Sequence, residues 1–188
     1  LENLKTLLIN NKTLSNKNLL YLNKIAKNYK IDKINKHKLD LVNELLLSVD
    51  IIPNAIVLAQ AANESGWGTS RFAKEYNALF GEYTYDFSNG VVPLRREDGA
   101  KHLVKSFTSV DKSVQSYFKN LNTHYAYKEF RYVRKIMREK NNFNDIDLLV
   151  DRLNTYALDE KYIETIKAII QSNNLQKFDS LNYTFISS

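Results

Sequence analysis

The sequence predicts a mainly helical α+β domain, on three observations. Apolar residues recur at helical spacing before residue 77 and again after residue 109. The segment between them is punctuated by Gly90, Pro93 and Gly99 and is typical of a β-hairpin. A length of 188 residues, with 44% apolar and 26% charged residues, suits one globular domain with a substantial core.

Helical periodicity predicts the elements in order. Residues 53–65 are apolar on nearly every side, which indicates a buried central helix. Pro53 suits its first turn and Gly66 the position after its last, while Ser109 and Asp159 suit the starts of later helices. A β-hairpin is expected from VVPLRR, the turn EDGA and KHLVKSF, with Pro93 restricting its first strand to an edge. The expected helices are 16–29, 38–49, 53–65, 70–76, 110–122, 127–140, 146–154 and 160–173, and 176–188 shows no helical pattern.

Composition excludes several classes of function. The chain has no Cys, and its three His are too dispersed for a metal site, so neither thiolate nor metal chemistry is expected. No phosphate-binding glycine loop and no membrane span are present in the sequence. The net charge of +6 suits a polyanionic partner such as nucleic acid, an acidic membrane or cell wall, or it serves solubility alone.

A basic stretch at 128–140, KEFRYVRKIMREK, has aromatic residues among its cations, as nucleic-acid-binding helices do. Phe130, Val133 and Met137 recur at helical spacing, however. This pattern favours an amphipathic helix with a solvated charged face. We therefore expect no nucleic-acid partner.

The stretch LAQAANESGWGTS contains the residue best suited to catalysis. Glu64 lies in the last turn of the apolar helix and shares a face with Val57, Gln60 and Ala61. Burial and the negative end of the helix dipole should both raise the pKa of its carboxyl. A carboxylic acid that stays protonated near neutral pH can protonate a departing sugar oxygen. Trp67 would offer a flat face to a sugar ring; alternatively, Glu64 is a surface residue and Trp67 belongs to the core.

The segment QAANESGWGTSRFAKEYNALFGEY closely resembles the signature of glycoside hydrolase family seventy-three, especially its Bax-type branch. The family pattern corresponds here to Glu64–Gly68, Ser70–Ala73 and Asn77–Gly81. The resemblance continues through residues 92–124 and through TYALDEKYIETIKAII, and it covers roughly 52–173. The first fifty residues show no such resemblance.

The resemblance implies a lysozyme-like fold, α+β and mainly helical, with a small β-hairpin lobe beside a glycan groove. It implies a peptidoglycan hydrolase, an endo-β-N-acetylglucosaminidase that cleaves after N-acetylglucosamine without a cofactor. Glu64 becomes the general acid, and Tyr156 a site residue that positions substrate or water, unless it is a core aromatic. Substrate contacts are expected from Gln60, Trp67, Asn77 and Phe80, with Phe80 either stacking on sugar or closing the core.

Glycosidases usually pair two carboxyl groups, and the second is harder to assign. In this family a proposed partner comes from the β-lobe, thirty to forty residues after the first. Glu97 at the hairpin turn is favoured, because a hairpin tip can carry it across the groove. Asp98, Glu82 and Asp86 are the alternatives, and a route assisted by the substrate's acetamido group needs no second carboxyl.

We expect a helical segment at 1–50 packed on the domain, a catalytic domain at 51–175 with its β-lobe at about 78–107, and a tail at 176–188. The alternatives are a muramidase with the same acid, or a peptidoglycan-binding module without activity. A cell-wall substrate places the protein in the periplasm or cell envelope, with any signal peptide outside this chain, which starts at Leu1. The expected partner is the glycan strand, and the protein is expected to be a monomer.

Overall fold

The computed structural model of the chain describes residues 1–32, 36–93, 99, 101–140, 142–143 and 145–179. It confirms a mainly helical α+β architecture with a small three-stranded antiparallel sheet. The chain forms two compact units, residues 1–51 with 119–155, and residues 52–118 with 156–188. Among the described residues, no helix is both long and apolar enough to cross a bilayer.

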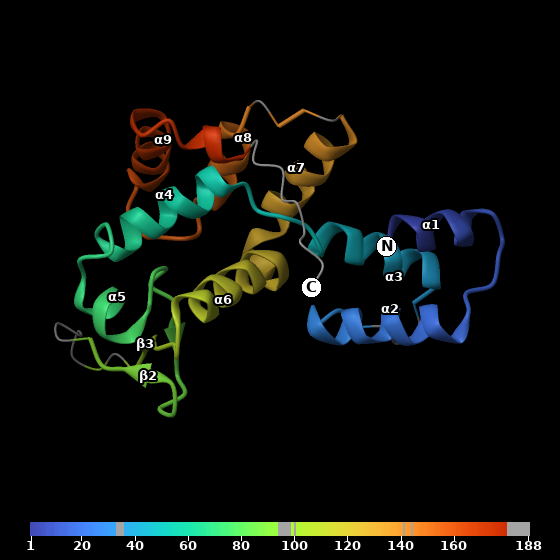
Figure 1. Cartoon of the computed structure of the whole chain (residues 1–188), viewed down its shortest axis with the longest axis horizontal. Coiled ribbons are helices and arrows are strands. Elements are labelled where there is room, and N and C mark those ends of the chain that lie inside the picture. Colours follow the sequence, from blue (N-terminus) through green and yellow to red (C-terminus); the bar gives the residue numbers. More distant parts are fainter. Residues whose placement is uncertain (33–35, 94–98, 100, 141, 144, 180–188) are drawn as a thin grey trace, which may run out of the picture. The chain divides into compact units, whose positions relative to one another are not determined.

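In the described part of the first unit all regular secondary structure is helical (Figure 1). Helix α3 packs against α1 and α2, and their leucines form one core with Leu22, Ala26, Leu41 and Leu45 at its centre. The expected helices at 16–29 and 38–49 are confirmed, whereas α1 is a helix that the sequence reasoning does not assign. The helical elements of the unit are α1 (Glu2–Ile9), α2 (Asn16–Asn28), α3 (Lys38–Ser48), the end of α6 (Val110–Thr123), η1 (Tyr125–Tyr127), α7 (Lys128–Glu139), α8 (Asp147–Val150) and η2 (Asp151–Leu153).

Helix α7 is amphipathic, as expected, but two of its arginines lie on the buried face. Phe130 and Met137 are buried as predicted and Val133 is partly buried, whereas Arg138 and the lysines are at least partly exposed. Arg131 and Arg134 are buried, so the expectation of a solvated charged face is wrong for these two residues. Their guanidinium groups are held by oxygens at the ends of neighbouring helices, where cations are favoured. Arg134 donates to Leu47 O, Ile51 O and Asn122 Oδ1, and Arg131 donates to Leu121 O and His124 O.

The second unit is built around α4 (Asn54–Ser65), which packs against α9 (Tyr162–Ser172) and the 3-10 turn η3 (Leu175–Phe178) (Figure 1). Gly66 ends α4 in the left-handed conformation, as expected, whereas Pro53 is the N-cap residue before α4 instead of part of its first turn. Burial of α4 on every side is not observed, because Leu58 is exposed and one flank lines a pocket of about 610 Å³.

The tail of the chain begins differently from expectation. Leu175–Phe178 forms a 3-10 turn, and the expected absence of helical structure from 176 onward is wrong at its start. The turn is tied to the start of α4, since Asn54 Nδ2 donates to Phe178 O at 2.7 Å and Asp179 Oδ1 accepts from Ala55 N at 3.0 Å. Residues 180–188 lie outside the described part.

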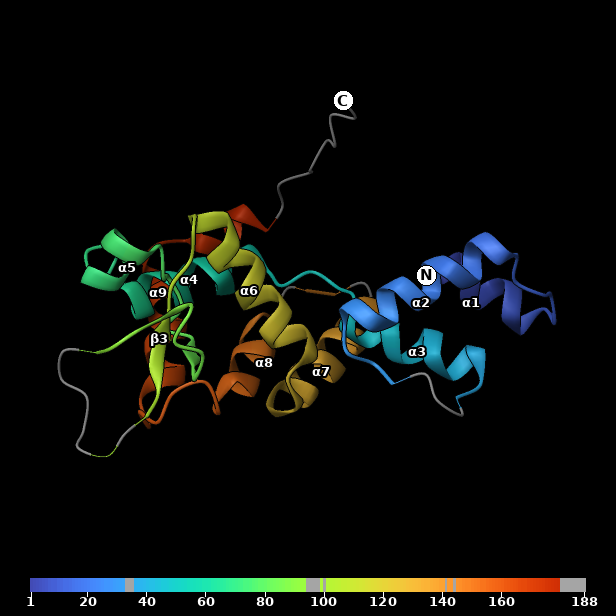
Figure 2. The ribbon, with the colours of Figure 1, turned by 90° about the horizontal axis from the view of Figure 1, so that it is seen from below.

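The β-lobe contains β1 (Tyr83–Thr84), β2 (Gly90–Val91) and β3 (Leu103–Lys105) in the order β1-β3-β2, all antiparallel (Figure 2 shows β3). The pairing of β2 with β3 confirms the expected hairpin, and β1 adds a strand that the sequence does not predict. Gly90 is required in β2, because a Cβ there would lie 2.5 Å from Leu103 Cδ1. The expected turn EDGA falls on residues 97–100, of which only Gly99 is among the described residues.

Candidate active site

Glu64 lies half-buried in the last turn of α4, where backbone from a distant segment meets it. Its Oε1 accepts a hydrogen bond from Asn63 Nδ2 at 3.3 Å, and the Tyr162 hydroxyl also binds the carboxyl. A Cβ on Gly81 would lie only 3.3 Å from Glu64 Oε2, and Gly81 has a φ of +61°. Both facts explain why glycine occupies position 81: it lets the backbone approach the carboxyl.

Burial raises the pKa of Glu64 above its ordinary value. The hydrogen bonds from Asn63 and Tyr162 favour the carboxylate and oppose this shift without cancelling it. Burial was one of the two expected causes of a raised pKa. Glu64 therefore holds its proton to higher pH than an exposed glutamate does, as a general acid requires.

Three buried side chains form a hydrogen-bonded chain that ends at the Glu64 carboxyl. Gln60 Nε2 donates to the Tyr162 hydroxyl at 2.6 Å, and the Tyr117 hydroxyl donates to Gln60 Oε1 at 2.5 Å. All three residues are buried. The direction of these bonds leaves the Tyr162 proton for Glu64, so the network fixes the orientation of the carboxyl.

Tyr162 is a site residue that sequence reasoning misses. It is the second tyrosine of the stretch TYALDEKYIETIKAII, in which only the first, Tyr156, is expected to be a site residue. The Tyr156 ring stacks on that of Tyr162, with centroids 5.8 Å apart and planes 5° apart, and its hydroxyl donates to Phe80 O at 3.0 Å. The stacked pair joins α9 to the backbone beside Gly81.

The expected substrate contacts lie in different environments. Gln60 is fully buried, and its amide nitrogen and oxygen both make hydrogen bonds to tyrosine hydroxyls. It therefore holds Tyr162 in place instead of contacting a sugar. Phe80 is buried, and its ring stacks on that of Tyr117 with centroids 4.0 Å apart. Of the two roles expected for Phe80, the structure therefore favours closing the core over stacking on a sugar. Asn77 has a left-handed φ of 53° at the end of α5 (Arg71–Tyr76), and its Nδ2 donates to Phe107 O at 3.1 Å.

Trp67 projects from the turn that follows α4. Its side chain is 63% exposed and lines the pocket beside α4, so the alternative that it belongs to the core is not observed. Gly66, Trp67 and Gly68 all have positive φ, which for a tryptophan costs about 1–3 kcal/mol. Hydrogen bonds from Trp67 N to Ala62 O and from Gly68 N to Ser65 Oγ, both 2.7 Å, hold this turn.

The four candidates for the second carboxyl differ in whether the structure describes them and in their burial and pKa. Glu97 and Asp98 lie outside the described residues. Glu82 is largely buried, which raises its pKa, while the Ser116 hydroxyl, donating at 2.9 Å, and the charge of Lys105 lower it. Asp86 is exposed, and its carboxylate accepts hydrogen bonds within its own turn, which lowers its pKa.

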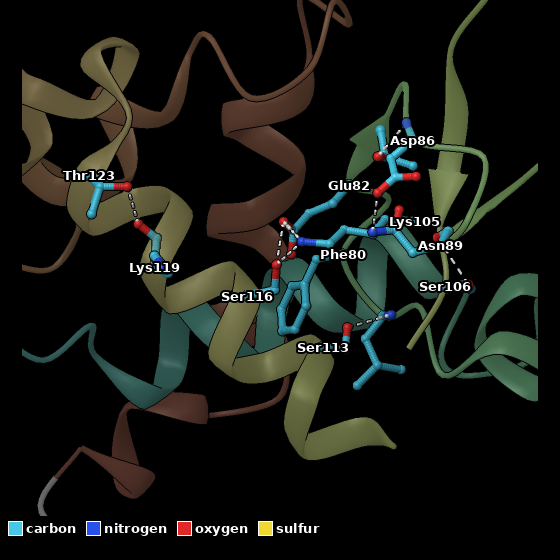
Figure 3. Close-up of polar contacts among 12 residues, drawn as sticks. Phe80, Glu82, Asp86, Asn89, Lys105, Ser106, Ser113, Ser116, Lys119 and Thr123 are labelled. Carbon is cyan, nitrogen blue, oxygen red and sulfur yellow. Dashed lines mark hydrogen bonds and ion pairs between the residues drawn. The ribbon is translucent and has the colours of Figure 1, made fainter. Parts of the chain in front are cut away.

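Helix α6 anchors the segment that approaches Glu64 (Figure 3). Ser113 Oγ accepts from Leu79 N at 3.2 Å, and Ser116 lies between Glu82 and Lys105, whose Nζ donates to Ser116 Oγ at 2.7 Å. Ser113, Ser116 and Tyr117 share one face of the helix. This face fixes the backbone on both sides of Gly81.

A half-buried carboxyl with a raised pKa at the end of a central helix, in a unit with a small antiparallel sheet, is the arrangement of the lysozyme-like class of glycoside hydrolases. In the described part of the chain, no three His, Asp or Glu side chains gather in a group suited to a metal ion.

The chain belongs to the glucosaminidase family described as mannosyl-glycoprotein endo-beta-N-acetylglucosaminidase, whose profile matches residues 40–175. It is 36% identical over 153 residues to protein bax of Escherichia coli (strain K12), covering 81% of this chain and 54% of that protein. It is 24% identical over 139 residues to the exo-glucosaminidase LytG of Bacillus subtilis (strain 168), covering 70% and 48%. The chain thus spans about half the length of these curated relatives.

The fold itself is similar to that of the catalytic domain of the autolysin Auto (Lmo1076) from Listeria monocytogenes. The TM-score is 0.51 at 18% sequence identity, and the similarity covers 95% of this chain and 96% of that one. This similarity supports the lysozyme-like fold.

Proposed function

We propose that this protein is an endo-β-N-acetylglucosaminidase that cleaves the β-1,4 glycan of peptidoglycan after N-acetylglucosamine. The observation that carries the proposal is Glu64, a half-buried carboxyl with a raised pKa, beside which Gly81 leaves room that a side chain would fill. Family membership supports the reaction class, and the names of the relatives, an exo-glucosaminidase and an autolysin, support the wall as substrate. Such a substrate places the protein in the periplasm or cell envelope.

Glu64 acts in this proposal as the general acid that protonates the departing sugar oxygen. Tyr162 and Gln60 orient it, Tyr156 holds the Phe80–Gly81 backbone beside it, and Trp67 contacts the glycan. No cofactor takes part. The proposed catalytic domain, residues 51–175, contains all of these residues, and the partner is the glycan strand bound by a monomer.

Replacing Glu64 by Gln tests the acid. The change keeps the shape of the side chain but removes the transferable proton, so activity on purified sacculi should fall by about 10²–10⁴-fold while the protein stays folded. Reducing-end analysis of the products should give N-acetylglucosamine ends. N-acetylmuramic acid ends would identify a muramidase instead, and binding of sacculi without any cleavage by the wild type would identify a binding module. Activity within a few-fold of wild type in the variant would exclude Glu64 as the acid.

Glu97 is proposed as the base that activates water. Glu97→Gln should lower kcat strongly and leave binding to sacculi nearly unchanged, because the interaction is made only in the transition state. Asp98→Asn, Glu82→Gln and Asp86→Asn are the matched controls and should be much milder. A larger loss in one of these three would transfer the assignment to that residue. Full activity in all four variants, with Glu64→Gln inactive, would favour the acetamido-assisted route.

A further inference from the structure

Three aromatic side chains of the β-lobe point into solvent at alternate positions. Tyr83, Tyr85 and Phe87 are 67%, 75% and 81% exposed. They belong to the aromatic stretch ALFGEYTYDF, whose buried member Phe80 is already explained by the core. Scattered exposed hydrophobics are ordinary, but a run of large rings on one short segment marks a surface with a binding partner. We name these three residues the aromatic platform.

The backbone beneath the platform is well fixed. Tyr83 and Thr84 pair with β3, and Asp86 organises the next turn. Asp86 Oδ1 accepts from Ser88 N at 2.9 Å, and Asp86 O accepts from Asn89 N at 3.3 Å. These bonds place Phe87 at the second position of a four-residue turn, where its ring projects outward.

Two further contacts stiffen the platform. Asn89 O accepts from Ser106 N at 2.7 Å and from Ser106 Oγ at 3.0 Å, which ties the turn to the end of the sheet (Figure 3). The Tyr83 ring lies against His102, with ring centroids 4.5 Å apart. Because the backbone that carries the rings is already ordered, binding a ligand costs little further backbone freedom.

We propose that the aromatic platform binds the glycan strand of peptidoglycan alongside the bond cleaved at Glu64. This inference rests on the proposed function. Gly81 lies against Glu64, and the chain runs directly from it into the platform. The Cα atoms of Tyr83 and Phe87 can be no more than about 7 Å and about 20 Å from that of Gly81, so a polymer bound at Glu64 reaches them. The C–H faces of pyranose rings are apolar and pack on aromatic faces.

The polar groups around the platform favour a sugar over a membrane. Asp86 stands between Tyr85 and Phe87, and hydrogen bonds from Ser88 lower the pKa of its carboxyl, so it is ionised at neutral pH. A carboxylate at this position repels the anionic headgroups of a bacterial bilayer. The hexosamine backbone of the glycan is uncharged, and its hydroxyl and acetamido groups suit the neighbouring carboxylate, amide and hydroxyl side chains.

Co-sedimentation with purified sacculi tests the platform in the Glu64→Gln background, where cleavage should be too slow to remove the ligand during the measurement. Combined Tyr83→Ala, Tyr85→Ala and Phe87→Ala changes should weaken binding by about tenfold or more, since each ring contributes a factor of a few. Tyr125→Ala is the matched control, because Tyr125 is 83% exposed, lies 4.5 Å from the His124 ring, and belongs to the other unit. Its binding should equal that of the parent protein. Tyr85→Ala alone should give a smaller loss, and melting curves verify folding of each variant.

With Glu64 intact, the triple variant should show a raised KM on sacculi and a nearly unchanged kcat. Wild-type affinity and KM in a folded triple variant would overturn the inference. Retained sacculus binding together with lost binding to phosphatidylglycerol vesicles would overturn it in favour of a membrane surface. If the wild type cleaves no sacculi but the platform changes still abolish sacculus binding, the proposed enzymatic function fails while the platform stands.

Discussion

At the scale of single residues, the candidate site depends on the position of the Glu64 carboxyl and of the groups around it. Glu64 is the proposed acid, and burial raises the pKa of its carboxyl. Gly81 has no side chain that would occupy the space beside this carboxyl, and the Tyr162 hydroxyl donates to it. Neither partner is close to Glu64 in sequence. A fixed, half-desolvated acid is therefore assembled from three segments of one unit.

Tyr162→Phe tests this assembly. Loss of the hydroxyl removes a bond that favours the carboxylate, so the pKa of Glu64 should rise further and the alkaline limb of the pH–rate profile should move to higher pH. The buried Gln60 Nε2 also loses its acceptor, which should lower stability by about 1–3 kcal/mol. Tyr125→Phe, at an exposed position, should change neither property. An alkaline limb that stays in place would show that Tyr162 has a purely structural role.

At the scale of elements, periodicity predicts most of the described helices, because Leu22, Leu41 and Leu45 are buried at the expected spacing. It misses β1, since two residues carry no detectable alternation. Local patterns locate Glu64 within its motif but not Tyr162, since no local pattern reveals a partner almost a hundred residues away.

Charge is equally ambiguous at this scale. The sequence of α7 cannot distinguish a solvated arginine from Arg134, which is buried because the ends of other helices supply acceptors. Burial lowers the pKa of Arg134 to about 10, still far above neutral, so it remains a cation. Its ion pair with Asp50, at 3.6 Å, offsets part of the cost of burial.

Arg134→Met should therefore destabilise the protein by about 3–5 kcal/mol, as removal of one partner from a buried ionic cluster does. The change leaves Leu47 O and Ile51 O without their guanidinium donor. Arg138→Met is the matched control, since Arg138 binds the same Asp50 from an exposed position, and it should cost about 1 kcal/mol or less. Denaturant unfolding of both variants gives the comparison, and equal losses would contradict the role assigned to burial.

At the scale of the whole molecule, the second unit holds carboxyl groups that are costly to ionise. Burial raises the pKa of Glu64, Glu82 and Asp179, and all three lie in this unit. Exposed Asp86 and Asp111 have lowered pKa values, so their contribution to the stability of the fold decreases as pH falls, and it does so at lower pH. The burial that raises these three pKa values therefore also makes the stability of the fold depend on pH.

The sign of that consequence follows from proton linkage. An acid whose folded pKa lies above its unfolded value binds more protons in the folded state across that interval, so stability falls as pH rises through it. For Glu64 and Glu82 the fall begins near the ordinary glutamate value of 4.5 and is complete above the folded pKa. Glu82→Gln cannot ionise and should lose this part of the pH dependence. Melting temperatures measured from about pH 4 to about pH 8 should therefore show the variant gaining on the wild type as pH rises. The test is the slope of the difference in melting temperature against pH. Altered contacts with Ser116 and Lys105 shift this difference by a constant amount and leave its slope unchanged. If the melting temperature of Glu82→Gln instead falls relative to that of the wild type as pH rises, Glu82 is stabilised as an anion and the prediction is wrong.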